Sequence, residues 1–421
     1  MQKKLLGMAV AAALAAPAVA LAQSAVQIYG TVHLSVMHTQ FSNVPAAAGG
    51  DVSKMGVNSV ASNWGLRSTE TLGSGMTAWL QMEFNAQMER RQTAGSATSS
   101  IPNNGEGTFR NSGLGLRGNF GNVYVGTWET PWAQTFRFWD VGTIGGWGPV
   151  TSIMGRREST NSGTTRNPNG DMATQGAPTA FGAGAATNNL GYSLWRRFQS
   201  AIFYESPLFA DVQFKLAYQP NENKAVGSSA APTVVSENPY AWSASLSWTG
   251  LGGRARAFVA NMQAKDWSSV GNTDGGWTAG GGYDFGVVNV GGAYESYTYK
   301  TGSPAIAGQQ AGLGDIKAKQ WAVGVAIPMG PGKIGASYAR AKDLEGPSFS
   351  DTGAHMWNLG YEWALSKRTA LGFGVAEMKN KANQGFTWTG LTAGPEGATE
   401  KSPLPNGTNL RNIFVSMRHS F

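Results

Sequence analysis

The side chains best suited to chemistry in this sequence are charged residues that alternate with apolar ones. Every second position of an extended chain lies on the same face. The polar face of this chain then carries a mixture of fixed charges, in which basic residues outnumber acidic ones. They are Arg67, Glu83, Arg117, Arg197, Glu205, Lys215, Arg256, Glu295, Glu362 and Arg418. Arginine stays protonated at any working pH, and rings of Arg or Lys beside a narrow water path favour anions. The chemistry predicted for these residues is electrostatic selection of ions.

Residues that could make or break bonds are scarce. The chain has no Cys and four His, which are His33, His38, His355 and His419. No Ser or Asp spacing gives them a nucleophilic triad, and no pair has the spacing of metal ligands. The Gly-rich segment 182–191 lacks the strand-to-helix pattern of a phosphate loop, and no basic helix suggests nucleic-acid binding. We therefore predict no catalytic residue, no metal site and no cofactor.

Strands are the elements that must position these charges. Apolar and polar residues alternate with period 2 in many segments, among them 26–36, 77–84, 213–218, 242–248 and 357–363. In one of them, Trp242, Leu246 and Trp248 alternate with serines. A soluble β-sandwich would show the same alternation as a membrane barrel. The lengths of the connections between strands distinguish the two folds.

Short and long connections alternate strictly along the chain. The short ones carry Gly or Pro near 72–75, 119–122, 207–211, 250–253, 284–287, 328–333 and 365–368, and the long ones span 39–58, 88–108, 134–195, 221–238, 265–275, 300–317, 342–353 and 380–408. Tight turns on one side and long loops on the other are typical of an outer-membrane barrel. The pattern predicts an all-β fold, a transmembrane antiparallel up-and-down β-barrel of about 16 strands around a water-filled lumen.

The N-terminus predicts export. Lys3 and Lys4 precede an apolar run from Leu5 to about Val19 and a small-residue site that ends at Ala22, which are the three zones of a secretory signal peptide. The run is shorter than the ~20 residues of a spanning helix. We expect cleavage of residues 1–22 and a single barrel domain over residues 23–421.

The composition fits strands that have one face in lipid. Charged residues make up only 14% of the 421 residues, and the chain holds 58 Gly and 15 Trp, whereas a soluble domain carries about 25% charge. Without Lys3 and Lys4, the 32 basic residues fall to 30, against 25 acidic ones. This small excess weakly favours anions.

Three segments carry a resemblance to a known family. They are AVQIYGTVHLSV (25–36), NWGLRSTETLGSG followed by MTAWLQMEF (63–84), and VSMRHSF (415–421), which ends in Phe421. They resemble the first strand, the second hairpin and the terminal strand of the Gram-negative general porins, in the branch common in β-proteobacteria. The resemblance covers nearly the whole mature chain. It implies a sixteen-stranded homotrimer, passive diffusion of small hydrophilic solutes and ions, and a third loop folded into the lumen as a constriction.

The candidate third loop, about 134–195, is the longest connection, and connections of that length are functional or disordered. Together with the wall it gives the predicted pore-lining set: Arg67, Glu83, Arg117, Arg137, Asp140, Arg156, Arg157, Arg197, Lys215 and Arg256. The proline-acid-phenylalanine-glycine tip usual in the family is not obvious in this loop. Four tryptophans flank or enter it, and they either form a stacking track for solutes or pin the loop to the wall: Trp128, Trp132, Trp139 and Trp147.

The sequence thus predicts an outer-membrane channel with a modest anion preference set by Arg and Lys at the constriction, in contact with outer-membrane lipid and lipopolysaccharide. Two alternatives remain open at this stage. One is a barrel enzyme of the lipase or protease type, and the other is a substrate-specific channel for sugars or aromatic solutes.

Overall fold

The structure is a computed structural model. It describes residues 26–46, 49–86, 88, 110–154, 197–220, 238–266, 271–301, 314–346, 350–388 and 404–421. The predicted signal peptide, residues 1–22, lies outside this part of the chain. Among the described residues, no helix is long and apolar enough to cross a membrane.

The described chain consists almost entirely of strands. In order they are β1 (Gln27–Ser42), β2 (Val52–Ser59), β3 (Asn63–Gly73), β4 (Met76–Asn85), β5 (Ser112–Gly118), β6 (Gly121–Glu129), β7 (Arg197–Glu205), β8 (Val212–Gln219), β9 (Tyr240–Gly250), β10 (Ala255–Lys265), β11 (Thr273–Asp284), β12 (Asn289–Thr301), β13 (Gly314–Met329), β14 (Gly332–Ala341), β15 (Ala354–Ala364), β16 (Thr369–Asn380) and β17 (Asn409–Ser420). Between β6 and β7 lie the helix α2 (Pro131–Gln134) and the 3-10 helix η2 (Thr135–Phe138), and η3 (Leu251–Gly253) follows β9.

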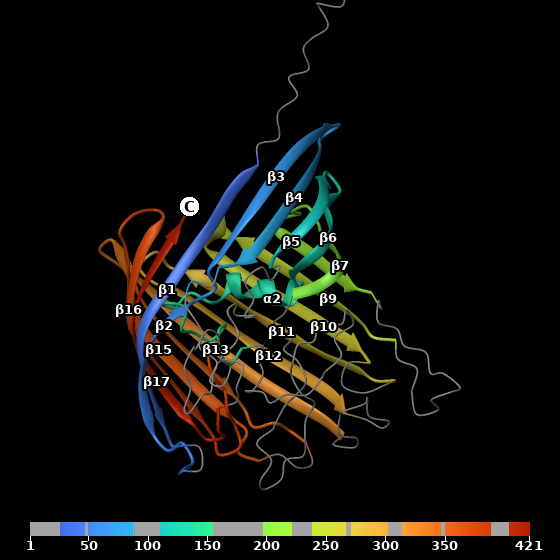
Figure 1. The fold of residues 1–421 in the computed structure, drawn as a ribbon. Helices are drawn as coiled ribbons and strands as arrows, with labels where there is room; N and C mark the ends of the chain where they lie inside the picture. The colour runs from blue at the N-terminus through green and yellow to red at the C-terminus, as the bar shows by residue number, and fades with distance from the viewer. Residues whose placement is uncertain are drawn as a thin grey trace, which may run out of the picture.

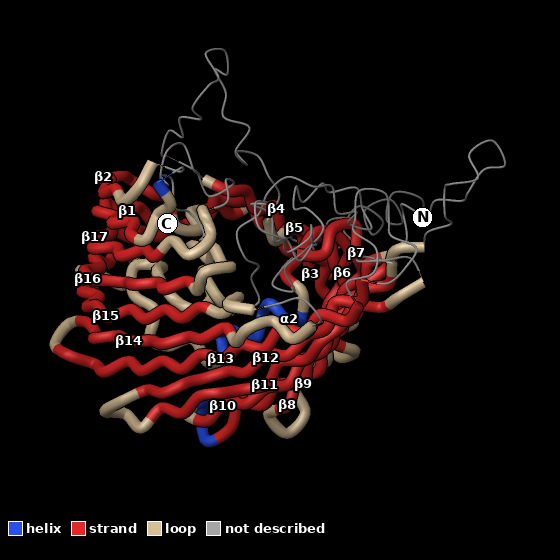
Figure 2. Tube along the Cα trace, turned by 90° about the horizontal axis from the view of Figure 1, so that it is seen from below, coloured by secondary structure: helices blue, strands red, loops and turns tan. Residues whose placement is uncertain are grey.

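All seventeen strands form one antiparallel sheet that closes on itself (Figures 1 and 2). Apart from β2 and β3, each strand pairs with the next, and β17 returns to pair with β1 from Thr31↔Ser420 to Ser42↔Asn409. Both β2 and β3 pair with β1, β2 along its second half and β3 along its first. These two strands share one position, so the barrel has sixteen positions, as the sequence predicts.

The two faces of the sheet differ as the alternation predicts. Exposed large apolar residues occupy the outward face, among them Val36, Leu80, Val125, Leu246 and Ile413. Several tryptophans lie on the same outer face, including Trp248 and Trp363. This is the pattern of a barrel whose outer wall faces lipid.

The third long loop folds into the barrel, as expected, and its described part runs from Thr130 to Met154. Figure 2 shows α2 inside the ring of strands. Thr130 caps this helix, because its hydroxyl accepts a hydrogen bond from the backbone N–H of Ala133 at 3.1 Å, and Pro131 occupies the first helical position. The backbone N–H of Trp132 then donates to the hydroxyl of Ser243 in β9 at 3.2 Å, which fixes the helix to that strand.

Glycines in the inner wall let the loop approach the strands closely. A Cβ on Gly291 would overlap the carbonyl oxygen of Trp139, and a Cβ on Gly335 would lie 2.7 Å from that of Gly142. Six consecutive strands, β11 to β16, each supply one glycine that faces the loop: Gly282, Gly291, Gly324, Gly335, Gly360 and Gly372. We call this set the glycine wall. Because it carries no side chains, the loop backbone lies directly against the backbone of the strands.

Two clusters of buried apolar residues hold the loop. Trp132 packs with aromatic residues of β4, β6 and β7, while Trp139, Ile144 and Trp147 pack with inward residues of β1 and β14 to β17. The last long connection adds to the second cluster, since the ring of Trp388 lies 6.2 Å from that of Trp147, at 90° to it.

Most connections lie where the sequence places them, and three are shorter than expected. Those expected over 265–275 and 300–317 are shorter because β11 begins at Thr273 and β13 at Gly314. All seven short turns fall between the predicted neighbours, for example Met76 after the turn at Gly73 and Gly332 after the turn at Met329. The predicted extent of the first long loop, 39–58, is wrong, because β1 continues to Ser42 and β2 begins at Val52.

Candidate functional site

Five basic side chains gather on one side of the lumen, along β3 to β8 and the start of the third loop. They are Arg67, Arg110, Arg137, Arg197 and Lys215, and we call them the basic wall. Three carboxylates, Glu83, Glu129 and Glu205, lie among them and form ion pairs with Arg110, Arg137, Arg197 and Lys215.

Glu129, the last residue of β6, connects the loop to the wall. Its Oε2 accepts a hydrogen bond from Nη2 of Arg137 at 2.7 Å, and its Oε1 accepts one from Nη2 of Arg197 at 3.1 Å. Arg197 also donates from Nε to the side-chain oxygen of Asn111 at 2.8 Å. One carboxylate therefore holds two guanidinium groups, one from the barrel and one from the loop.

Glu83 organises the next part of the wall. It accepts hydrogen bonds from Nε of Arg110 at 2.7 Å and from the hydroxyl of Tyr29 at 3.2 Å. The guanidinium carbon of Arg67 lies 5.2 Å from the centre of the Tyr29 ring, and its Nε donates to Gln27 at 2.9 Å. Arg67 thus stacks on an aromatic face and contacts no carboxylate among the described residues.

Lys215 ties β8 to the loop. Its Nζ lies 3.0 Å from Oε1 of Glu205 and donates to the side-chain oxygen of Gln134 in α2 at 2.7 Å. Glu205 also accepts from the hydroxyl of Tyr124 at 3.4 Å. Lys215 therefore joins the end of α2 to a carboxylate of the barrel wall.

The arginines around Glu129 are more exposed than the carboxylate that they share. The Arg137 side chain is 49% exposed and the Arg197 side chain 27%, whereas Glu129 is 17% exposed. The other two pairs differ little, with 17% for Arg110 against 12% for Glu83, and 20% for Lys215 against 21% for Glu205. Around Glu129, water in the lumen therefore meets mainly positive charge.

Asp140 lies apart from the basic wall, beneath the loop. It lines a cavity of about 510 Å³ together with Asp284, Lys333 and Glu362 near the short turns of β11 to β16. Its carboxylate accepts a hydrogen bond from the hydroxyl of Thr143 at 2.7 Å. Burial raises the pKa of Asp140 from its usual 3.8 to about 6, although the Thr143 hydroxyl and the Lys333 ammonium oppose the rise.

The structure separates the predicted pore-lining residues into groups. Arg67, Glu83, Arg137, Arg197 and Lys215 come together in the basic wall. Three others lie elsewhere, as Asp140 sits beneath the loop, Arg117 pairs in register with Asn122 next to a short turn, and Arg256 donates to Asn289 at 2.8 Å. Arg156 and Arg157 lie outside the described residues.

Sequence reasoning missed Arg110, Glu129 and Tyr29. Strict alternation after the outward residues Val123 and Val125 would point Glu129 outward. The register between β6 and β7 shifts between Gly126 and Trp128, however, and Ser200 opposite has a φ of +45°. Such a bulge twists a strand pair and re-aims its side chains. Arg110 lies just before β5, where no alternation could be followed, although an acid facing it at Glu83 was a usable signal.

The four tryptophans serve packing. Trp132, Trp139 and Trp147 are at most 1% exposed, so their rings are not available to a passing solute. Trp128 packs edge-on against Trp79 and Tyr124, at 5.6 and 5.2 Å between ring centres. Among the described residues, no group of three or more His, Cys, Asp or Glu could hold a metal ion.

A closed barrel of sixteen antiparallel strands, apolar outside and charged inside, with its third long loop folded into the lumen, defines the class of outer-membrane porins. The family model for Gram-negative porins matches residues 9–383, and the chain belongs to that family. It is therefore an outer-membrane channel rather than an enzyme.

Comparisons with known proteins agree with this assignment. Outer membrane porin protein 32 of Delftia acidovorans is 28% identical to this chain over 427 residues, with 100% of both chains covered. A solved anion-selective porin from Comamonas acidovorans gives a TM-score of 0.60 at 24% identity and covers 95% of this chain and 100% of its own. The trimer form of OmpT from Vibrio cholerae gives a TM-score of 0.56 at 13% identity, with 94% and 99% covered.

Proposed function

We propose that this porin passes small hydrophilic solutes and prefers anions, and that the basic wall sets the preference. The observation that carries the proposal is the excess of five cations over three carboxylates in the basic wall, with Arg137 and Arg197 more exposed than the Glu129 carboxylate between them and Arg67 bonded to no carboxylate among the described residues. A passing anion therefore meets more positive than negative charge. The description of the structurally similar porin from Comamonas acidovorans as anion-selective agrees with this proposal.

The physical basis is incomplete screening. The Debye length is about 8 Å at physiological salt, so a fixed charge beside a narrow water path acts on nearly every ion that passes. Guanidinium groups remain protonated throughout the useful pH range. The basic wall therefore contributes an anion preference that does not change with pH. Ionisation of Asp140 adds a second contribution, which does depend on pH.

The reversal potential of the purified protein in a planar lipid bilayer under a potassium chloride gradient tests the proposal. We expect a sign that corresponds to faster chloride passage. A reversal potential that shows faster potassium passage would refute the anion preference.

Passive diffusion of neutral solutes is tested separately by swelling of proteoliposomes. We expect swelling rates that fall smoothly with the size of small sugars. A sharp preference for one sugar over others of equal size would instead favour a substrate-specific channel. The burial of Trp132, Trp139 and Trp147 argues against such a channel.

We also propose that the protein is a homotrimer and that residues 1–22 are removed during export. Support for the trimer comes from the trimer form of OmpT, which shares the fold. The mass of the detergent complex tests the assembly, and a monomeric mass would contradict it. N-terminal sequencing of protein from the outer membrane tests the cleavage, for which we expect Gln23 as the first residue.

A further inference from the structure

The outer wall of the barrel carries an apolar groove over β11 to β15. Its volume is about 860 Å³, and its lining is almost entirely apolar. In register, Gly281 of β11 lies opposite Gly292 of β12, so two adjacent outward positions have no side chain. On the other side of the groove, Tyr338 lies opposite Trp357. The missing side chains and the large flanking rings together form the groove.

The outward residues change in character along these strands, from apolar to aromatic to basic. At the next outward-facing positions, on the side of the groove that is nearer the long loops, the sheet register aligns Tyr294 with Trp321, Trp321 with Arg340, and Arg340 with His355. One step further lies Lys319, whose backbone oxygen accepts from the backbone N–H of Lys342. Aromatic rings of this kind mark the level of lipid headgroups, so the basic residues lie at or beyond that level.

These cations outnumber the carboxylates beside them. Lys319 pairs with Glu345 at 2.5 Å, while Arg340 and Lys342 have no ion-pair partner among the described residues. Nearby acids are matched by other cations, because Asp343 pairs with Lys381 at 2.6 Å and Asp315 lies opposite Lys300 in register. The surface above the groove therefore has a net positive charge.

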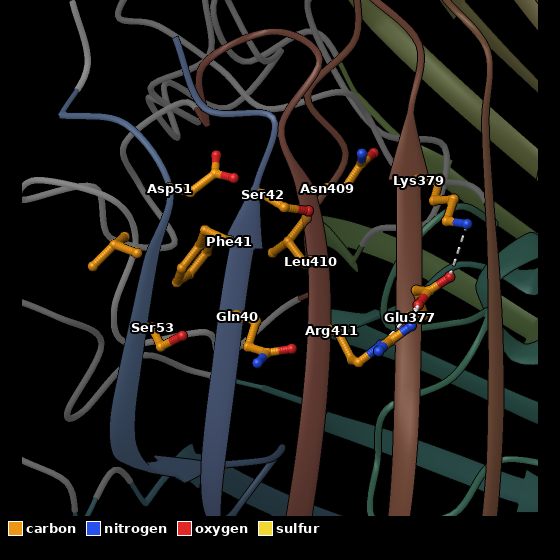
Figure 3. A pocket seen from close by; sticks show the side chains of 11 residues that line it. Gln40, Phe41, Ser42, Asp51, Ser53, Glu377, Lys379, Asn409, Leu410 and Arg411 are labelled. Atoms are coloured by element: carbon orange, nitrogen blue, oxygen red, sulfur yellow. Dashed lines mark hydrogen bonds and ion pairs between the residues drawn. The ribbon is translucent and has the colours of Figure 1, made fainter. Parts of the chain in front are cut away.

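The neighbouring strands provide a contrast. Figure 3 shows a polar cavity of about 480 Å³ by β1, β2, β16 and β17, where Glu377 lies between Lys379 and Arg411. Glu377 pairs with Lys379 at 3.3 Å and with Arg411 at 2.6 Å. Both cations at that site are held by one carboxylate, and the cavity lining is mainly polar. Unlike this site, the surface over β11 to β15 joins an apolar groove to cations that have no ion-pair partner among the described residues.

We propose that the groove and the cations above it form a binding site for one lipid of the outer leaflet whose headgroup carries phosphate. An acyl chain lies in the groove against Gly281, Gly292 and Ala336. The phosphate groups contact Arg340, Lys319 and Lys342. Guanidinium groups form bidentate hydrogen bonds with phosphate, and such contacts replace water that exposed cations would otherwise hold. The positive charge of the site and its position at or beyond the aromatic rings identify the occupant as a lipid whose headgroup carries phosphate.

Native mass spectrometry of the detergent-purified protein with added bisphosphoryl lipid A tests the site. The charge variant is Arg340→Gln with Lys319→Gln and Lys342→Gln, and the matched control is Lys367→Gln with Arg368→Gln, in the exposed turn at the other end of β15 and β16. We expect lipid retention to fall at least about tenfold in the charge variant and to stay unchanged in the control. A second variant, Ala336→Phe, fills the groove without changing charge and should also lower retention.

Three results would overturn the proposal. They are equal retention by the charge variant and the unmodified protein, equal retention of dephosphorylated lipid A, and displacement of the lipid by millimolar inorganic phosphate alone. A change in oligomer mass on Ala336→Phe with lipid retained would show that a second copy covers the groove, which also contradicts it. Unchanged single-channel conductance in each variant shows that the barrel is folded, since the substitutions lie on its outer face or, in the control, in an exposed turn.

Discussion

At the scale of single residues, Glu129 explains why the basic wall is both ordered and positive. Two guanidinium groups share its carboxylate, and hydrogen bonds between ionised groups are about twice as strong as neutral ones. The electrostatic repulsion between the two guanidinium groups is offset by the negative charge of the carboxylate between them. The remaining positive charge is therefore held in place, and a passing ion meets it in a fixed geometry.

Replacing Arg137 with Gln should weaken the anion preference. The side chain is the most exposed cation of the pairs with Glu129 and Glu83, and its loss leaves Glu129 with one partner. We expect the ratio of chloride to potassium permeability to fall about two- to fivefold, as expected for one charge near an ion path. Bilayer reversal potentials measure the ratio. Arg117→Gln is the control, and an equal effect of both variants would show that total charge rather than the basic wall matters.

Asp140 should give the channel a pH dependence near pH 6. Its raised pKa keeps the carboxyl neutral in acid and lets it ionise above about 6. The groups that face it are Lys333, Asp284 and Glu362. Ionisation adds a negative charge to the lumen, so the anion preference should be greater at pH 5 than at pH 7. Reversal potentials at both pH values measure this difference, and Asp140→Asn should abolish it. A pH dependence that persists in Asp140→Asn would assign the titration to another group.

At the scale of elements, the third loop is held from two sides. The glycine wall admits its backbone to the strands, and the last long connection covers its second half through Trp388. Asn358 adds a hydrogen bond from its side-chain nitrogen to the carbonyl oxygen of Gly142 at 3.1 Å. The described part of the loop, from Thr130 to Met154, is therefore part of the packed interior.

Removing the Trp388 ring should loosen this packing. The residue is 0% exposed, and truncation of a buried Trp to Ala costs about 3–5 kcal/mol. We expect Trp388→Ala to increase fluctuations of the open-channel current while the barrel stays intact. Single-channel recording measures the fluctuations. Trp363→Ala, on the outer face, is the matched control, and equal current noise in both variants would contradict a role for Trp388 in holding the loop.

The sequence predicts these elements better than it predicts their local irregularities. The short turns are marked by Gly and Pro at fixed intervals, so their places and the strand number follow directly. The interruption between β2 and β3 and the bulge opposite Gly126 leave no such mark. Alternation assigns a face to each residue only while the ladder is regular, which is why it proposes Arg67 and Lys215 as lumen residues and leaves out Glu129.

At the scale of the whole molecule, charge is distributed unevenly around the lumen. The basic wall lies along β3 to β8, while the loop and its acidic residue Asp140 pack toward β11 to β17. The positive charge is thus concentrated on one side of the water path, and it reaches passing ions only within the screening length of the solution.

The anion preference should therefore decrease as the salt concentration rises. The Debye length falls from about 10 Å at 0.1 M to about 3 Å at 1 M, so the fixed charges act on fewer of the passing ions. Reversal potentials measured at a constant gradient ratio, with the mean concentration raised tenfold, test this expectation. A preference that does not change with salt would mean that ions bind directly to the wall in single file.

The glycine wall has a consequence for engineering. Most of its contacts are with loop backbone atoms between Phe138 and Gly145, so it requires that backbone path, together with the buried side chains of Trp139, Ile144 and Trp147. None of these contacts involves residues 155–196. A library that varies only residues 155–196 should thus leave the frame of the barrel intact, and single-channel conductance would measure what each variant does to the pore.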